Sequence, residues 1–193
     1  LPDFPEAKQK NKRIGVPRTF VNDAQPETKA VFETKLSELA AKGYEIVDIE
    51  LNTAPYALPA YYIVMPAEVS TNLARLDGVR YGLHVDGANL KDDYKLSRSA
   101  GFGPETRRRI ILGSYILSSG YYDAYYRRAT ALRSLIAADL AKAYESVSYI
   151  ATPTAPGPAF KIGEKADPVS MYLEDIFSAP ANLAGLPSIS VPM

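Results

Sequence analysis

Arg109 and Asp175 are the residues whose chemical types could hold a ligand with two opposite charges. Arg109 lies in GFGPETRRRIILG at 101–113, and Asp175 lies in MYLEDIF at 171–177. A guanidinium is a planar fork that matches a carboxylate bidentately, and a carboxylate can hold an ammonium group. The pair therefore suggests a clamp for the two charged ends of an amino acid.

The alternative interpretation is that both residues are ordinary charged side chains on the solvent-exposed surface. Arg107, Arg108 and Arg109 are consecutive, so a helix spreads them about 100° apart, and only one or two can face a single pocket. The others are then a basic face in water, and Asp175 is an ordinary carboxylate on a short helix. Spacing alone does not decide between the clamp and this alternative.

No residue type in a suitable pattern supplies a nucleophile for such a clamp. His84 is the only histidine and lies in a glycine-rich stretch, where we expect a surface or loop-packing role. Ser118 and Ser119 lack the G-x-S-x-G context, and we expect serine there to cap a helix beginning near Tyr121. The GFG run at 101–103 resembles a weak anion cradle, although turn geometry explains its glycines equally well.

Composition narrows the possible functions. The chain has 193 residues, no cysteine and one histidine, which excludes disulfides, thiolate catalysis, cysteine-bound metals and a histidine-rich metal site. Lys+Arg and Asp+Glu balance at 22 each, so no global field recruits nucleic acid or an anionic membrane. No stretch reaches the roughly 18–20 apolar residues of a membrane span, and the charged start is no signal peptide. We expect a cytoplasmic protein and, from its length, one domain.

The elements that must position these residues indicate an α/β fold. RIGVP at 13–17 and EIVDIEL at 45–51 read as strands, and a helix is expected at 26–42, between Pro26 and Gly43. Strand, helix and strand in so few residues form a βαβ-like unit.

The remainder of the chain is mostly helical by its pattern. A loop is expected at 77–87, a strand at 148–152 followed by a rigid proline-rich loop, and a final strand in SISVP at 188–192. Helices are expected at 57–76, 92–99, 104–117, 120–145 and 169–178. For most of Tyr121, Tyr122, Tyr125 and Tyr126 we favour core packing over a pocket wall or an interface.

Four long blocks resemble a known family. They are YYIVMPAEVSTNLARLDGVRYG (61–82), GFGPETRRRIILGSYILSSGYYDAYYRRA (101–129), TPTAPGPAF (152–160) and MYLEDIFSAPANLAGLPSISVP (171–192). In this order they resemble the A subunits of bacterial glutamyl-tRNA(Gln) and aspartyl-tRNA(Asn) amidotransferases, which are amidase-signature enzymes. The resemblance implies part of the amidase-signature fold, a mixed sheet flanked by helices.

The resemblance also implies a function. Such subunits release ammonia from glutamine with a Ser–cis-Ser–Lys triad. A partner B subunit uses ATP and Mg to activate Glu-tRNA(Gln) for amidation, and a small C subunit braces the heterotrimer. Matching the motifs residue by residue places the glutamine contacts at Tyr61, Arg109 and Asp175. Arg109 would pair with the α-carboxylate, Asp175 with the α-ammonium group, and Tyr61 would add a hydrogen bond.

The chain departs from the family pattern in one large respect. The Gly/Ser-rich signature with the lysine and both serines does not occur in it, and the family's C-terminal tail does not either. We therefore assign no catalytic residue, metal or cofactor to this chain. We expect residues 1–193 to be the C-terminal portion of a single amidase domain. Alone, this portion should be inactive and should bind glutamine weakly or not at all.

Two other functions stay open at this point. The first is a part of a stand-alone amidase-signature hydrolase that acts on another amide and needs no tRNA. The second is a non-catalytic interaction module that uses its tyrosine-rich surface. An amino-acid clamp argues against the first, because a simple amidase does not need to recognise an α-amino acid.

Overall fold

The computed structural model describes residues 11–165 and 167–193, which form two compact units. Among the described residues, the first unit joins 11–58 with those between Leu132 and Met193, and the second is Pro59–Ala131. The prediction about the charged start falls mostly on residues 1–10, which lie outside the described residues. The prediction of a single domain over 1–193 stays a prediction.

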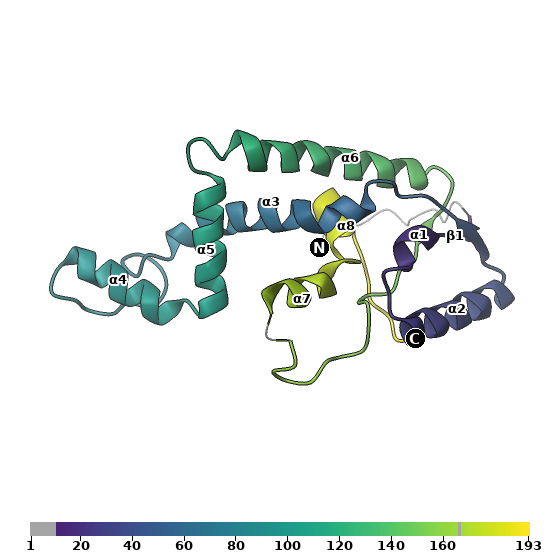
Figure 1. Ribbon diagram of the computed structural model, residues 1–193, viewed down its shortest axis with the longest axis horizontal. Helices are drawn as coiled ribbons and strands as arrows, with labels where there is room; N and C mark the ends of the chain where they lie inside the picture. Colours follow the sequence, from purple (N-terminus) through teal and green to yellow (C-terminus); the bar gives the residue numbers. More distant parts are fainter. Residues whose placement is uncertain (1–10, 166) are drawn as a thin grey trace, which may run out of the picture. The chain divides into compact units, whose positions relative to one another are not determined.

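The first unit is built around a small parallel sheet (Figure 1). Its strands are β1 (Arg13–Val16), β2 (Glu45–Asp48) and β3 (Tyr149–Ile150), in the order β2-β1-β3. Both pairings are parallel, with Ile14 opposite Ile46 on one side and Tyr149 on the other. The predicted α/β class is therefore confirmed, and the strands predicted at 13–17, 45–51 and 148–152 are present in shorter form.

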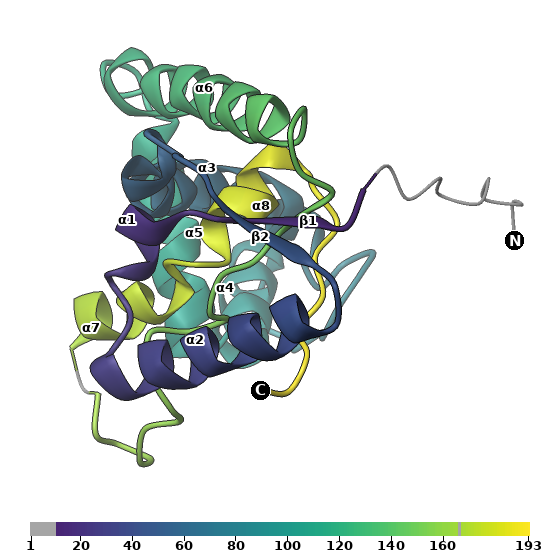
Figure 2. The same cartoon turned by 90° about the vertical axis from the view of Figure 1, so that its right-hand side faces the viewer.

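Helix α2 (Pro26–Ala41) connects β1 to β2 and packs beside the sheet (Figure 2). Pro26 occupies its first turn, where a missing N–H costs nothing, and Gly43 follows its end with φ +86°. The buried side chains between helix and sheet come from Ile14, Val16, Val21, Phe32 and Leu36. This is the expected βαβ unit.

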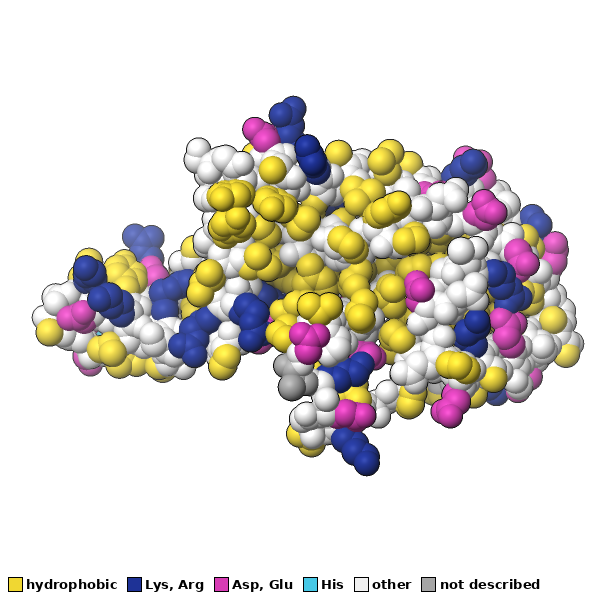
Figure 3. All heavy atoms as spheres, viewed as in Figure 1, with side chains coloured by type: hydrophobic (Ala, Val, Ile, Leu, Met, Phe, Trp, Pro, Cys, Tyr) yellow, Lys and Arg dark blue, Asp and Glu magenta, His cyan; other side chains and the backbone are white. Residues whose placement is uncertain are grey.

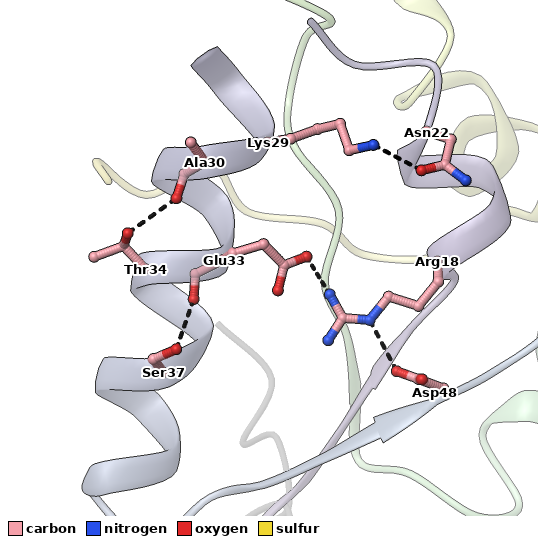
Figure 4. A network of polar contacts seen from close by, with 8 residues as sticks. All are labelled: Arg18, Asn22, Lys29, Ala30, Glu33, Thr34, Ser37 and Asp48. Atoms are coloured by element: carbon pink, nitrogen blue, oxygen red, sulfur yellow. Dashed lines mark hydrogen bonds and ion pairs between the residues drawn. The ribbon is translucent and has the colours of Figure 1, made fainter. Parts of the chain in front are cut away.

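Arg18 ties the sheet to its helix through ion pairs (Figure 4). It begins the short helix α1 (Arg18–Val21), which Pro17 separates from β1. Its Nε donates to Asp48 at the end of β2 at 2.9 Å, and its Nη1 pairs with Glu33 of α2. The hydrogen bond to Asp48 raises the pKa of Arg18 most, burial lowers it by a smaller amount, and Glu33 raises it further.

The C-terminal part of the same unit contains short helices, which are α7 (Pro168–Tyr172), the 3-10 turn η4 (Leu173–Asp175) and α8 (Ala179–Ala184). Phe177 follows η4 and packs edge-on against Phe20 at 5.2 Å between ring centroids. The short helix predicted at 169–178 is present in shorter form, because its α-helical part ends at Tyr172 and continues as the 3-10 turn to Asp175. The strand predicted at 188–192 is wrong, since it pairs with no described strand and Ile189 is 87% exposed.

The second unit is helical, with α3 (Ala57–Asn72), which begins at the unit boundary, α4 (Leu90–Gly101) and α5 (Pro104–Ile116). The loop predicted at 77–87 is confirmed, and Gly78 and Gly82 adopt positive φ within it. Asn89 caps α4, because its side-chain oxygen accepts from the Asp92 N–H at 3.2 Å.

The long helix predicted at 120–145 begins with a π-helical turn, η3 (Asp123–Arg127), before α6 (Arg128–Ala143). Within that turn the Arg127 N–H donates to the Tyr122 carbonyl at 3.1 Å. The predicted serine cap is wrong, because the Ser118 hydroxyl donates back to the Tyr115 carbonyl at 2.7 Å. In the first unit, Asp139 of α6 accepts from both the N–H and the hydroxyl of Thr53.

Three of the four tyrosines around this turn are exposed and Tyr126 is half-buried, which contradicts the core packing predicted for most of them. Tyr121, Tyr122 and Tyr125 keep 41–45% of their surface in water. Hydrophobic side chains gather on the surface where α5 leads into α6 (Figure 3). The rings of Tyr121 and Tyr125 stack with their centroids 6.1 Å apart, and the centroid of the Tyr115 ring lies 4.3 Å from that of Tyr121. They cover one another rather than entering a core.

Among residues 11–165 and 167–193, no helix is long and apolar enough to cross a bilayer.

Candidate functional site

The candidate site forms where α5 crosses α3 in the second unit. Gly113 of α5 lies so close to Pro66 of α3 that a Cβ added to it would meet the Pro66 carbonyl oxygen at 1.9 Å. Both residues are buried. Only glycine permits this approach, because any side chain would push the two helix backbones apart.

The crossing determines which side chains meet one turn earlier on each helix. Arg109 precedes Gly113 by four residues, and Tyr62 precedes Pro66 by four residues, so each lies on the same helix face as its neighbour in the crossing. The guanidinium carbon of Arg109 consequently lies 5.9 Å from the centre of the Tyr62 ring. This distance is within the range of a cation–π interaction.

Arg109 makes two further contacts. Its Nε donates to Glu105 Oε1 at 2.8 Å, and its Nη1 donates to the Met65 sulfur at 3.4 Å. The Arg109 side chain is 28% exposed, against 52% for Arg108. The expectation that only one or two of the three arginines face inward is confirmed, because Arg109 faces α3 while Arg107 and Arg108 face water.

The charge of Arg109 is stabilised inside this site. Partial burial lowers its pKa, but the hydrogen bond and negative charge of Glu105, with smaller effects of Tyr62 and Tyr61, together more than offset that effect, so the pKa is raised. Glu105 also pairs with Arg108 through its other oxygen. Lys and Arg side chains show prominently on the surface over α4 and the N-terminal end of α5 (Figure 3).

Tyr61 is half-buried on α3, and its ring meets the Tyr62 ring edge-on at 5.2 Å. The structure thus brings two of the three predicted glutamine contacts, Tyr61 and Arg109, into one unit and onto facing helices. Sequence reasoning missed Tyr62, Met65 and Glu105. The four-residue spacing of Glu105 and Arg109 was a usable signal for the last of these.

Asp175, the third predicted contact, belongs to the first unit. It closes η4 and is half-buried, and its backbone carbonyl accepts from the Ser178 N–H and hydroxyl, both at 3.1 Å. Its neighbour Glu174 pairs with Lys165. The assignment of Asp175 to the α-ammonium group stays a prediction.

His84 has the loop-packing role that its sequence context favoured. Its Nδ1 faces the Gly78 carbonyl, and its Nε2 lies 3.0 Å from Asp86 Oδ1. The GFG run joins α4 to α5, with Gly101 ending the first helix and Gly103 preceding the second. Within the part of the chain that the structure describes, no group of three or more acidic or histidine side chains could hold a metal ion.

Comparison with known proteins gives consistent results. The amidase family profile matches residues 2–193. The chain is 53% identical over 185 residues to the A subunit of glutamyl-tRNA(Gln) amidotransferase from Parvibaculum lavamentivorans, covering 95% of this chain and 38% of that protein. The protein of the same name from Pelagibacter ubique is 56% identical, with the same coverage.

Solved structures share the fold. The A subunit of glutamyl-tRNA(Gln) amidotransferase from Thermotoga maritima superposes with a TM-score of 0.64 at 34% identity, covering 90% of this chain and 33% of that one. An amidase gives a TM-score of 0.68 at 20% identity and covers 95% of this chain and 40% of that one, which shows the fold alone. The chain spans about two fifths of the length of the curated relatives it matches. Because the family profile extends over nearly all of the 193 residues, the chain belongs to the amidase family.

Proposed function

We propose that this chain is the glutamine-recognising part of the A subunit of a tRNA-dependent amidotransferase. The observation that carries the proposal is its 53–56% identity, over 95% of the chain, to proteins named as A subunits of glutamyl-tRNA(Gln) amidotransferase. The site supports it, because Arg109 lies partly buried beside aromatic rings, where a cation binds a carboxylate more strongly than it does in water.

In this proposal three side chains recognise glutamine. Arg109 binds the α-carboxylate, Asp175 binds the α-ammonium group, and the Tyr61 hydroxyl adds a hydrogen bond. A site whose polar groups need these partners rejects amides that lack them, because the unmatched groups would be left desolvated. The selectivity for an α-amino acid follows from these pairs.

The chemistry itself is proposed for the longer protein. One serine there attacks the glutamine side-chain amide, with a lysine and a second serine relaying protons, and backbone N–H groups stabilise the oxyanion. Ammonia then passes to a B subunit that uses ATP and Mg to convert Glu-tRNA(Gln) to Gln-tRNA(Gln). A C subunit completes a cytoplasmic heterotrimer.

The first test replaces Arg109 by alanine in the full-length protein within its complex. Loss of a charge-assisted bidentate contact costs about 1.5–3 kcal/mol, so the KM for glutamine should rise about 10- to 150-fold. Steady-state glutaminase kinetics measure this effect, and Asp175→Ala should behave similarly. Arg107→Ala is the matched control, because Arg107 is exposed on the same helix.

Two results would contradict the proposal at different levels. If Arg109→Ala and Asp175→Ala both keep the wild-type KM, the binding assignment is wrong. If the wild-type complex hydrolyses amides without any coupling to ATP and Glu-tRNA(Gln), the protein is a stand-alone amidase instead.

A further inference from the structure

Glu105 holds one edge of the Arg109 guanidinium. We propose that Glu105 is a positioning residue that turns the opposite edge of Arg109, the Nη1–Nη2 edge, toward the α-carboxylate of the substrate. The inference rests on the proposed function and deepens it, since it assigns the binding edge and a residue that controls it.

The geometry of Glu105 suits this role. It lies in the first turn of α5, one helical turn before Arg109, where a carboxylate is stabilised by the helix dipole. Oε1 accepts from Arg109 Nε at 2.8 Å, and Oε2 pairs with Arg108. The two arginines thus hold the carboxylate from both sides, and the carboxylate in turn restricts the rotamers of Arg109.

The opposite edge of Arg109 offers a contact that a ligand can replace. Nη1 donates to the Met65 sulfur at 3.4 Å, and a thioether is a weak acceptor. A carboxylate oxygen accepts much more strongly, so its exchange for the sulfur favours binding. The Tyr62 ring lies beside the same guanidinium and limits its movement.

Binding at the other edge is disfavoured by charge. A substrate carboxylate at Nε would displace Glu105 or lie directly against it, and two carboxylates in contact repel. Glu105 therefore excludes one of two approaches to Arg109 and fixes the orientation of the bound amino acid. Removing it should weaken binding of the carboxylate without changing the chemical step.

The test uses the full-length protein in its complex, with glutamine and with glutaminamide, which lacks the α-carboxylate. Glu105→Ala should raise the KM for glutamine about tenfold, the size of one charge-assisted hydrogen bond, while kcat stays within about twofold. Glu105→Gln keeps an oxygen acceptor for Nε and should recover part of the loss. The kcat/KM for glutaminamide should be unchanged in both variants.

The control is Arg107→Gln, which removes an exposed charge from the same helix and leaves the contacts of Glu105 with Arg108 and Arg109 in place. It should keep a KM near that of the wild type. The inference is overturned if Arg109→Ala raises the KM for glutamine and Glu105→Ala does not. It is also overturned if Glu105→Ala lowers kcat/KM equally for both amides, because that pattern indicates a merely structural role. A wild-type complex that hydrolyses no glutamine refutes the proposed function, and this inference with it.

Discussion

At the scale of single residues, Gly113 determines where Arg109 can act. The two lie one turn apart on α5, and the close approach at Gly113 and Pro66 holds α5 against α3. If the helices moved apart, Arg109 would lose the Tyr62 ring and the Met65 sulfur together. Gly113 thus maintains the contacts that surround the Arg109 guanidinium.

We predict that Gly113→Ala destabilises the protein by about 1–3 kcal/mol, the usual cost of forcing extra volume into a packed contact. Urea denaturation followed by circular dichroism measures the change. Gly101→Ala is the matched control, because its Cβ would meet only the Leu83 Cβ at 3.8 Å, and it should change stability by less than about 0.5 kcal/mol. Equal midpoints for both variants would show that the helices adjust without cost.

The sequence alone pointed to some residues of this candidate site and not to others. Arg109 and Tyr61 could be selected from long sequence blocks, and the structure places them on facing helices. Tyr62 and Met65 could not, because their contact with Arg109 depends on how α3 and α5 cross. The exposed tyrosines were misjudged for a related reason. A tyrosine suits a core and a surface equally, and the elements around it decide which it occupies.

At the scale of elements, the loop between α3 and α4 is organised by short polar contacts. The Asp77 side chain accepts from the N–H groups of Val79 and Arg80 at 2.8 and 3.1 Å, and these bonds lower the pKa of Asp77. The hydrogen bond to the Gly78 carbonyl, then that to Asp86, raises the pKa of His84. Both partners of the imidazole are acceptors, so only the protonated ring can donate to both.

We predict that this loop loosens as pH rises. A folded-state pKa above the ordinary value of 6.5 means that the stabilisation is fully present below that value and is lost as pH passes the raised pKa. Hydrogen exchange of residues 77–89, corrected for the intrinsic effect of pH, should show more protection at pH 6 than at pH 8. The difference should vanish in His84→Asn, and a difference that persists there would assign it to another group.

Elements with strong periodicity were predictable, and irregular ones were not. The βαβ unit at the N-terminal end followed from alternating and helical patterns flanked by Pro26 and Gly43. The π-helical turn has no such signature, since it differs from an α-helix by one hydrogen-bond step. The prediction of a strand at 188–192 was wrong because an alternating pattern indicates only that a segment is suited to pairing. A strand also needs a neighbouring strand with which to form hydrogen bonds.

At the scale of the whole molecule, the chain covers about two fifths of its relatives, and its sequence offers no nucleophile that we could assign. We predict that residues 1–193 expressed alone release no ammonia from glutamine, whereas the full-length protein in its complex does. An ammonia assay measures both, with circular dichroism to verify that the shorter chain is folded. Ammonia release by the shorter chain would place a nucleophile within it.

The family was predictable at the scale of the whole molecule, because four long sequence blocks occur in the family's order. No single element could have shown this resemblance.

The π-helical turn at Asp123–Arg127 also has a consequence for changes in chain length. Such a turn holds one residue more than an α-helical turn, so a deletion of one amino acid there can be absorbed by conversion to regular α-helix. The residues just before it would rotate by about 100° around the helix axis, which would carry Tyr121 and Tyr122 to a different face. A one-residue difference between homologues at this position would therefore change the aromatic surface without interrupting the helix that follows.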